Sequence, residues 1–67
     1  METQRVVEPA LLSIEESARV LRIGRSRAYE LASVGELPGL VRIGRSLRVS
    51  RRALDAWIDE QAAPMVR

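Results

Sequence analysis

Apolar residues recur at helical spacing near the start of the chain. Ile14, Ala18 and Leu21 follow one another at steps of four and three residues, which places them on one face of a short helix. Ser13 and Glu16 have the spacing of a capping box, in which two side chains satisfy two free backbone N–H groups at the helix start. The pattern therefore predicts a helix from Ile14 to Leu21.

A second helix is predicted directly after the first. Residues 25–34 have helical spacing and are followed by Gly35, a natural stop. The residues between the two helices, 22–24, include a glycine, which is unfavourable inside a helix. Two short helices joined by such a turn form the helix-turn-helix pattern. The apolar stripe of the second helix consists of Ala28, Leu31 and Ala32.

Alternating side chains predict a β-hairpin in residues 40–49, LVRIGRSLRV. We expect a three-residue reversal at Gly44-Arg45-Ser46. A two-residue loop would place Val41 opposite Arg48, so the apolar residues of the two strands would not face one another. Arginines that face each other repel, unless a polyanion lies along them. This arrangement is expected of a wing. The preferred register pairs Val41 with Val49, Ile43 with Leu47, and Arg42 with Arg48.

A third helix is predicted from Arg51 to about Gln61, with Ser50 as its N-cap. We expect Trp57, the only Trp in the chain, to be a core residue. The apolar stripe comprises Leu54, Trp57 and Ile58, with Gln61 beside them. The acidic residues Asp55, Asp59 and Glu60 lie elsewhere, either as a solubilising surface or as a head-to-tail contact with a basic neighbouring copy.

The composition argues against several classes of protein. The 67 residues include no His and no Cys, so His and Cys catalysis, Cys/His zinc sites and disulfides are excluded. A chain of this length has little room for a deep catalytic pocket beside its core. Neither a membrane-spanning run nor a signal-peptide pattern occurs. We expect a cytoplasmic protein that is not an enzyme and uses no cofactor or metal.

The charge and the domain organisation point to one basic domain. Residues 19–52 hold nine Arg and two Glu, a net charge of +7, although the whole chain has only +2. Every basic residue is Arg, which reflects either a genomic bias toward GC-rich codons or a use of the planar guanidinium, which binds phosphate and guanine with paired hydrogen bonds. DNA is therefore the indicated partner. We expect an N-terminal arm over 1–10, a folded domain over 11–61 and a flexible tail over 62–67.

Three groups of residues are candidates for DNA contact, each with a plainer alternative. The polar face of the second helix is either a base-reading surface or a solvated face. The wing arginines either follow DNA or keep a sheet edge from aggregating. The helix group is Arg25, Ser26, Arg27, Tyr29, Glu30 and Ser33, of which Glu30 either accepts from cytosine or pairs with a neighbouring Arg. The wing group is Arg42, Arg45, Ser46 and Arg48, and the backbone group is Arg19, Arg22, Arg51 and Arg52.

Four short motifs follow one another along residues 11–58: LSIEESA at 12–18, GELP at 35–38, GR at 44–45 and LDAWI at 54–58. In this order and spacing they resemble the small winged helix-turn-helix domain of phage and plasmid excisionases, a compact relative of the DNA-binding part of MerR regulators. Two departures are Gly24, where the family usually has Ser or Thr as N-cap, and Arg22, where it commonly has Gly. The pentapeptide RIGRS occurs at 22–26 and at 42–46 but falls in different elements, so it is no structural repeat.

The resemblance implies an α+β fold of helix, helix, β-hairpin and helix, and a recombination directionality factor. Such a protein binds and bends attachment-site repeats in the host nucleoid and helps phage integrase to excise a prophage. The second helix would enter the major groove, and copies would assemble head to tail. Two other functions fit the same residues: a small transcriptional regulator, and a protein-interaction module without a DNA role.

Overall fold

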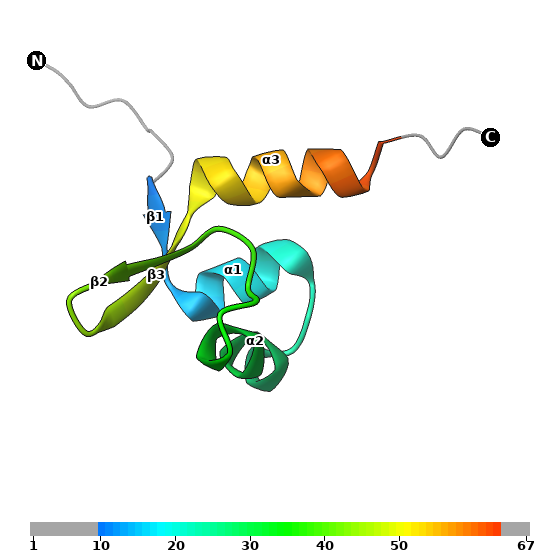
Figure 1. Ribbon diagram of the computed structural model, residues 1–67. Helices are drawn as coiled ribbons and strands as arrows, with labels where there is room; N and C mark the ends of the chain where they lie inside the picture. Colours follow the sequence, from blue (N-terminus) through cyan, green and yellow to red (C-terminus); the bar gives the residue numbers. More distant parts are fainter. Residues whose placement is uncertain (1–9, 64–67) are drawn as a thin grey trace, which may run out of the picture.

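Three helices and a small antiparallel sheet make up residues 10–63, the part of the chain that the computed structural model describes. The predicted α+β winged helix-turn-helix is confirmed. Residues 1–9 and 64–67, which include most of the predicted arm and tail, lie outside the described residues. The elements are β1 (Leu11–Leu12), α1 (Ile14–Leu21), α2 (Arg25–Ser33), β2 (Leu40–Ile43), β3 (Ser46–Ser50) and α3 (Arg51–Gln61) (Figure 1).

Side-chain caps fix where two of the helices begin. The Ser13 hydroxyl accepts from the Glu16 N–H at 3.0 Å, and the Glu16 carboxylate accepts from the Ser13 N–H at 2.9 Å, so the predicted capping box is confirmed. At the start of α3, the Ala53 N–H donates to the Ser50 hydroxyl at 3.1 Å. Helix α2 ends one residue earlier than predicted, with Val34 as its C-cap.

The sheet contains a strand that the hydrophobic pattern did not reveal. Leu11 pairs with Ser50 and Leu12 with Val49, so β1 lies antiparallel to β3 and the strand order is β1-β3-β2. The Arg51 N–H donates to the Ala10 carbonyl at 2.9 Å and continues the ladder. Two residues are too few to show alternation, which is why the sequence predicted only a hairpin. Strand β1 attaches the start of the domain to the central strand.

The hairpin register differs from the predicted one. Gly44 and Arg45 form a two-residue turn, and only Gly44 has a positive φ, 59°. Glycine in the first of two turn positions is the pattern of a type II′ hairpin, whose twist matches that of the strands. The prediction did not pair Leu40, which is half-buried and lies opposite the buried Val49. The pairs are Leu40 with Val49, Val41 with Arg48, Arg42 with Leu47, and Ile43 with Ser46.

This register corrects the expected wing surface. Because paired residues share a face, Arg42 lies on the face of Leu47, whereas Arg48 lies on the face of Val41. The predicted facing pair of arginines is therefore wrong, and no repulsion between them has to be relieved. Ile43, which was expected to be covered by Leu47, is 51% exposed.

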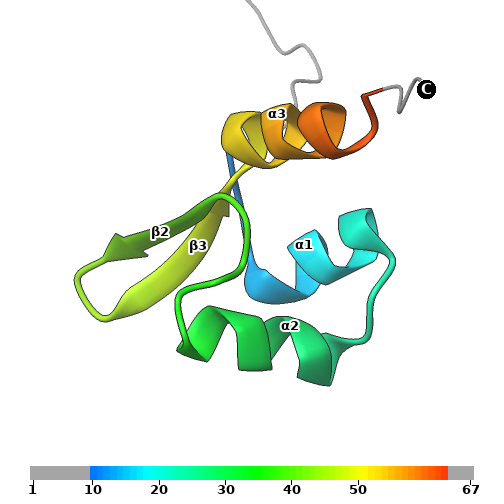
Figure 2. The ribbon, with the colours of Figure 1, turned by 45° about the vertical axis from the view of Figure 1, so that its right-hand side comes forward.

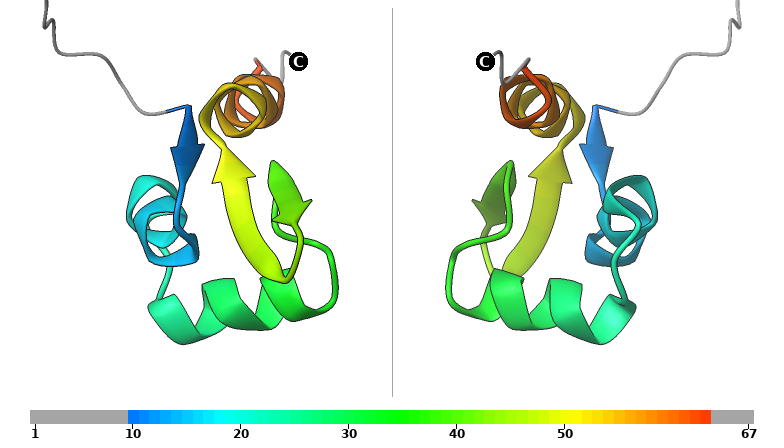
Figure 3. Two further views of the ribbon diagram at one scale, coloured as in Figure 1. Left: turned by 90° about the vertical axis from the view of Figure 1, so that its left-hand side faces the viewer. Right: turned by 90° about the vertical axis from the view of Figure 1, so that its right-hand side faces the viewer.

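The core is built around α1, which lies between α2 and α3 (Figures 2 and 3). Leu54 of α3 and Val49 of β3 are fully buried, and Ala28 fixes α2 against them. Ser17 is also fully buried, and its hydroxyl is satisfied by donating to the Ile14 carbonyl at 2.8 Å. Burial of these small and medium side chains holds the three helices around the sheet.

Trp57 is not a core residue, contrary to the prediction. Its exposed fraction is 40%, because the second half of α3 extends beyond the sheet and is covered on one side only (Figure 1). The apolar stripe of α3 predicted that Leu54 and Trp57 would both lie in the core, but only Leu54 is buried there. Trp57 lines an open groove of about 310 Å³ between α1 and α3. The other lining residues are Val20, Leu21, Ile58, Gln61 and Ala62.

The connector between α2 and β2 depends on Gly39. This residue has φ of 80°, and its carbonyl accepts from the Ser50 N–H at 2.7 Å. A Cβ atom built on it would lie 3.0 Å from the Ser50 carbonyl oxygen and 3.2 Å from the Leu54 nitrogen. Nearby, the buried Leu37 anchors the same connector in the core. The close approach joins the connector to the start of α3.

Candidate nucleic-acid interface

The turn between α1 and α2 sets the direction of the second helix. Arg22 has a left-handed backbone with φ of 59°, and its N–H donates to the carbonyl of Arg19 at 3.2 Å. The Ile23 N–H then donates to Ala18 at 3.0 Å, and the Ile23 side chain packs against the core. Gly24 occupies the N-cap of α2 without a side-chain bond, as expected from its lack of a side chain.

Helix α2 buries one face and exposes the other. Ala28 and Ala32 are buried, which leaves a polar outer surface. Within that surface Arg27 donates to the Glu30 carboxylate at 3.2 Å, so Glu30 pairs with a neighbouring Arg, which is one of its two expected roles. The Ser33 hydroxyl donates to the backbone carbonyl of Glu30 at 2.8 Å. The structure places all six predicted helix residues on the exposed side: Arg25, Ser26, Arg27, Tyr29, Glu30 and Ser33.

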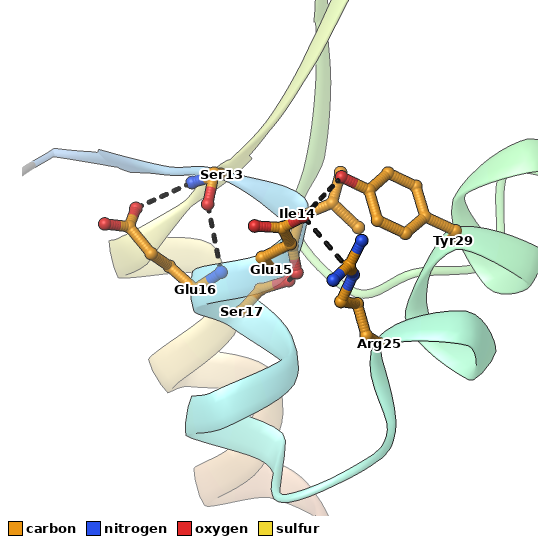
Figure 4. A network of polar contacts seen from close by, with 7 residues as sticks. All are labelled: Ser13, Ile14, Glu15, Glu16, Ser17, Arg25 and Tyr29. Atoms are coloured by element: carbon orange, nitrogen blue, oxygen red, sulfur yellow. Dashed lines mark hydrogen bonds and ion pairs between the residues drawn. The ribbon is translucent and has the colours of Figure 1, made fainter.

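A carboxylate that the sequence analysis did not select connects α1 to this surface. Glu15 lies in the first turn of α1, and one of its oxygens contacts both Arg25 and Tyr29, each at 3.3 Å (Figure 4). The capping box drew attention to Glu16, its neighbour. No local pattern links Glu15 to residues 10 and 14 positions later, because the contact forms only when the two helices pack.

The wing and α2 share one groove. Its volume is about 380 Å³, and it joins Tyr29 and Ser33 of α2 to Arg45 and Arg48 of the wing. The guanidinium of Arg48 also donates to the Leu47 carbonyl at 2.8 Å, which holds it against its own strand. The remaining lining residues are Ser13, Ile14, Ala32 and Leu47.

The other predicted wing residues are exposed but do not line this groove. Arg42 lies near the end of β2, and Ser46 begins β3 directly after the turn. The hairpin projects away from the helices (Figure 1), and its register places Arg42 and Arg48 on opposite faces of the hairpin.

The four predicted backbone-contact arginines fall into two separate pairs. Arg19 lies one helical turn after Glu15 on α1, and Arg22 lies in the turn that precedes α2. Arg51 and Arg52 begin α3, which α1 separates from α2 (Figure 2). Arg51 is half-buried and contacts Asp55 at 3.3 Å.

Two packed helices with a tight turn, followed by a β-hairpin wing, define a winged helix-turn-helix protein. The chain belongs to the helix-turn-helix domain family, whose model matches residues 11–62.

Two relatives illustrate the similarity. The chain is 42% identical over 54 residues to a protein of Saccharopolyspora erythraea named a probable excisionase, a match that covers 81% of this chain and 54% of the relative. It is 43% identical over 49 residues to a Mycobacterium tuberculosis protein provisionally named as DNA-binding, covering 73% of this chain and 62% of that one. The chain thus spans between half and two thirds of the length of these relatives. No solved structure matches.

Two further observations concern residues 10–63. No helix in this range is long and apolar enough to cross a membrane. No group of three or more Asp or Glu residues there is arranged to hold a metal ion.

Proposed function

We propose that this protein is a sequence-specific, double-stranded DNA-binding and DNA-bending protein that acts as an excisionase. The observation that carries the proposal is the groove in which Tyr29 and Ser33 of α2 meet Arg45 and Arg48 of the wing. Base-reading and phosphate-binding side chains on one surface are what recognition of a duplex requires. The similarity to a protein named a probable excisionase supports the excisionase assignment, and the similarity to a protein provisionally named as DNA-binding supports DNA binding.

In the proposed complex α2 enters the major groove, which is wide enough to admit a helix. The exposed residues of α2 read base edges, and the wing follows the neighbouring backbone or minor groove. Arg19 on α1 and Arg22 in the turn that precedes α2 contact phosphates. Arg51 and Arg52 begin α3, which α1 separates from α2 (Figure 2), so a duplex that reaches them as well has to bend around the protein.

A salt titration tests whether the chain binds DNA at all. If five or six phosphates are neutralised, log K falls against log salt with a slope of about −4.5 to −5.5. The measurement is fluorescence anisotropy on a labelled random duplex between low and moderate salt. Absence of binding even at low salt would refute the proposal and favour a protein-interaction module.

Two substitutions separate base recognition from backbone contact. Arg25→Ala is expected to relax sequence preference, because Arg25 lies at the start of α2 on its exposed face. Arg45→Ala is expected to weaken binding to all duplexes equally, because Arg45 lies in the wing turn. Equal effects on preference from both changes would contradict the assignment.

The excisionase role and the regulator role need a different assay. Excision by phage integrase, measured with and without this protein, is expected to depend on it. Equal excision in both reactions would favour the small transcriptional regulator, and promoter repression would support that alternative. A footprint with direct repeats on attachment-site DNA would support head-to-tail assembly, for which Asp59 and Glu60 are an exposed acidic surface.

A further inference from the structure

We infer that Glu15 is a positioning residue that determines which bases Arg25 and Tyr29 select, an inference that rests on the proposed DNA-binding function. The Glu15 Oε2 atom lies 3.3 Å from Nε of Arg25 and accepts a 3.3 Å hydrogen bond from the Tyr29 hydroxyl (Figure 4). Arg25 and Tyr29 are four residues apart and so lie on one side of α2. A single carboxylate on α1 thereby orients a full turn of the neighbouring helix.

The contact with Arg25 leaves its base-reading atoms available. Glu15 engages Nε, whereas the two terminal Nη groups can form the fork that recognises O6 and N7 of guanine. The Arg25 side chain is 71% exposed, so this fork is accessible. Arg25 also begins α2, where the helix dipole disfavours a cation, and the first turn of α2 has no acidic residue. Glu15 supplies that negative charge from the adjacent helix.

The contact with Tyr29 restricts what its hydroxyl can recognise. An ionised carboxylate only accepts hydrogen bonds, so the single hydroxyl proton is committed to Glu15. The Tyr29 oxygen is then left as an acceptor, and the residue is 46% exposed. In the major groove an acceptor recognises the amino group of adenine or cytosine. The geometry therefore assigns guanine to Arg25 and a neighbouring adenine or cytosine to Tyr29.

The same carboxylate acts against binding to unrelated sequences. Its charge repels phosphates, and it competes with them for the Arg25 guanidinium. Without it, Arg25 can reach the backbone of any duplex and the Tyr29 proton can be donated to other acceptors. Glu15→Gln is therefore expected to strengthen binding to random DNA and to weaken discrimination.

The test compares affinity for a preferred duplex, selected by the unchanged protein from a randomised library, with affinity for random duplex. In Glu15→Gln the ratio of the two is expected to fall about tenfold or more, since one bidentate base contact accounts for discrimination of that size. Repeating the selection with the variant is expected to show loss of preference at the guanine position. Tyr29→Phe is expected to keep the guanine and to lose the neighbouring preference.

Glu16→Gln is the matched control. It removes the same charge one residue away, keeps the capping box because Gln also serves there, and touches neither Arg25 nor Tyr29 in the structure. Its affinity ratio is expected to stay within about twofold of the unchanged protein. Urea unfolding of Glu15→Gln shows whether stability changes.

The outcomes distinguish this inference from the proposed function. If the unchanged protein binds no duplex, DNA binding itself is refuted, and the role of Glu15 is refuted with it. If the unchanged protein prefers its selected site and Glu15→Gln retains the same ratio, DNA binding stands and only the role of Glu15 is overturned. A parallel loss of affinity for both duplexes, together with lower stability, would make the Glu15 contacts merely structural and would also overturn it.

Discussion

Replacing Gly39 by alanine tests whether the close approach of the connector to α3 holds the fold together. The residue has φ of 80°, so alanine there incurs the left-handed penalty of about 1–2 kcal/mol. The new Cβ would also lie 3.0 Å from the Ser50 carbonyl oxygen and 3.2 Å from Val49 Cγ1. Forced shifts in a packed region cost about 1–3 kcal/mol more. The expected loss of unfolding free energy is about 2–5 kcal/mol, comparable with the whole core contribution in a domain this small.

Gly35→Ala is the matched control for this change. Gly35 has a similar φ of 75°, but nothing lies within 4 Å of a Cβ built on it. It should therefore lose only the backbone term, about 1–2 kcal/mol. Urea titrations monitored by circular dichroism at one temperature measure the free energy of unfolding of both variants. Equal losses in the two variants would show that the close approach at Gly39 does not matter, and would refute the reasoning.

Three further changes have outcomes that the structure determines. Arg22→Gly relieves a left-handed arginine with φ of 59° and should raise the free energy of unfolding by up to about 1 kcal/mol. Fluorescence anisotropy should show weaker binding of this variant to every duplex, and a lower stability would contradict the prediction. Ser50→Ala removes the N-cap of α3 and should cost about 1 kcal/mol in urea unfolding, and an unchanged midpoint would contradict the cap. Leu54→Ala should lower the free energy of unfolding by about 2–5 kcal/mol, as expected for a fully buried leucine. Trp57→Ala should lower it clearly less, because Trp57 is 40% exposed. The reverse order of the two losses would contradict the burial of these residues.

Helix bounds were predictable because local chemistry sets them. The Ser13 capping box and the Ser50 cap act within three residues along the chain, so their spacing is visible in the sequence. Both predicted helix starts are confirmed. The exposed side of α2 was predictable for the same reason, since helical periodicity separates Ala28 and Ala32 from the residues opposite them.

The features that were missed depend on contacts between distant segments. The hairpin register was decided by Leu40, which the predicted pairing left without a cross-strand partner, and by the backbone of Gly44. The exposure of Trp57 depends on how far α3 extends beyond the sheet, which no stripe on one helix can show. Glu15 lies 14 residues from Tyr29, and only the packing of α1 on α2 brings them together.

Because Trp57 is partly exposed, its intrinsic fluorescence reports on what covers this part of α3. Tyr29 is the only other aromatic residue in the sequence, so long-wavelength emission from the protein comes from a single indole. That indole sits on α3, which α1 separates from the helix proposed to contact DNA (Figure 2). Its emission should stay nearly constant while a duplex that contacts only α2 and the wing is added, and it should shift to shorter wavelength when another protein covers the groove between α1 and α3. The tryptophan emission wavelength therefore monitors protein assembly separately from nucleic-acid binding, without an added label.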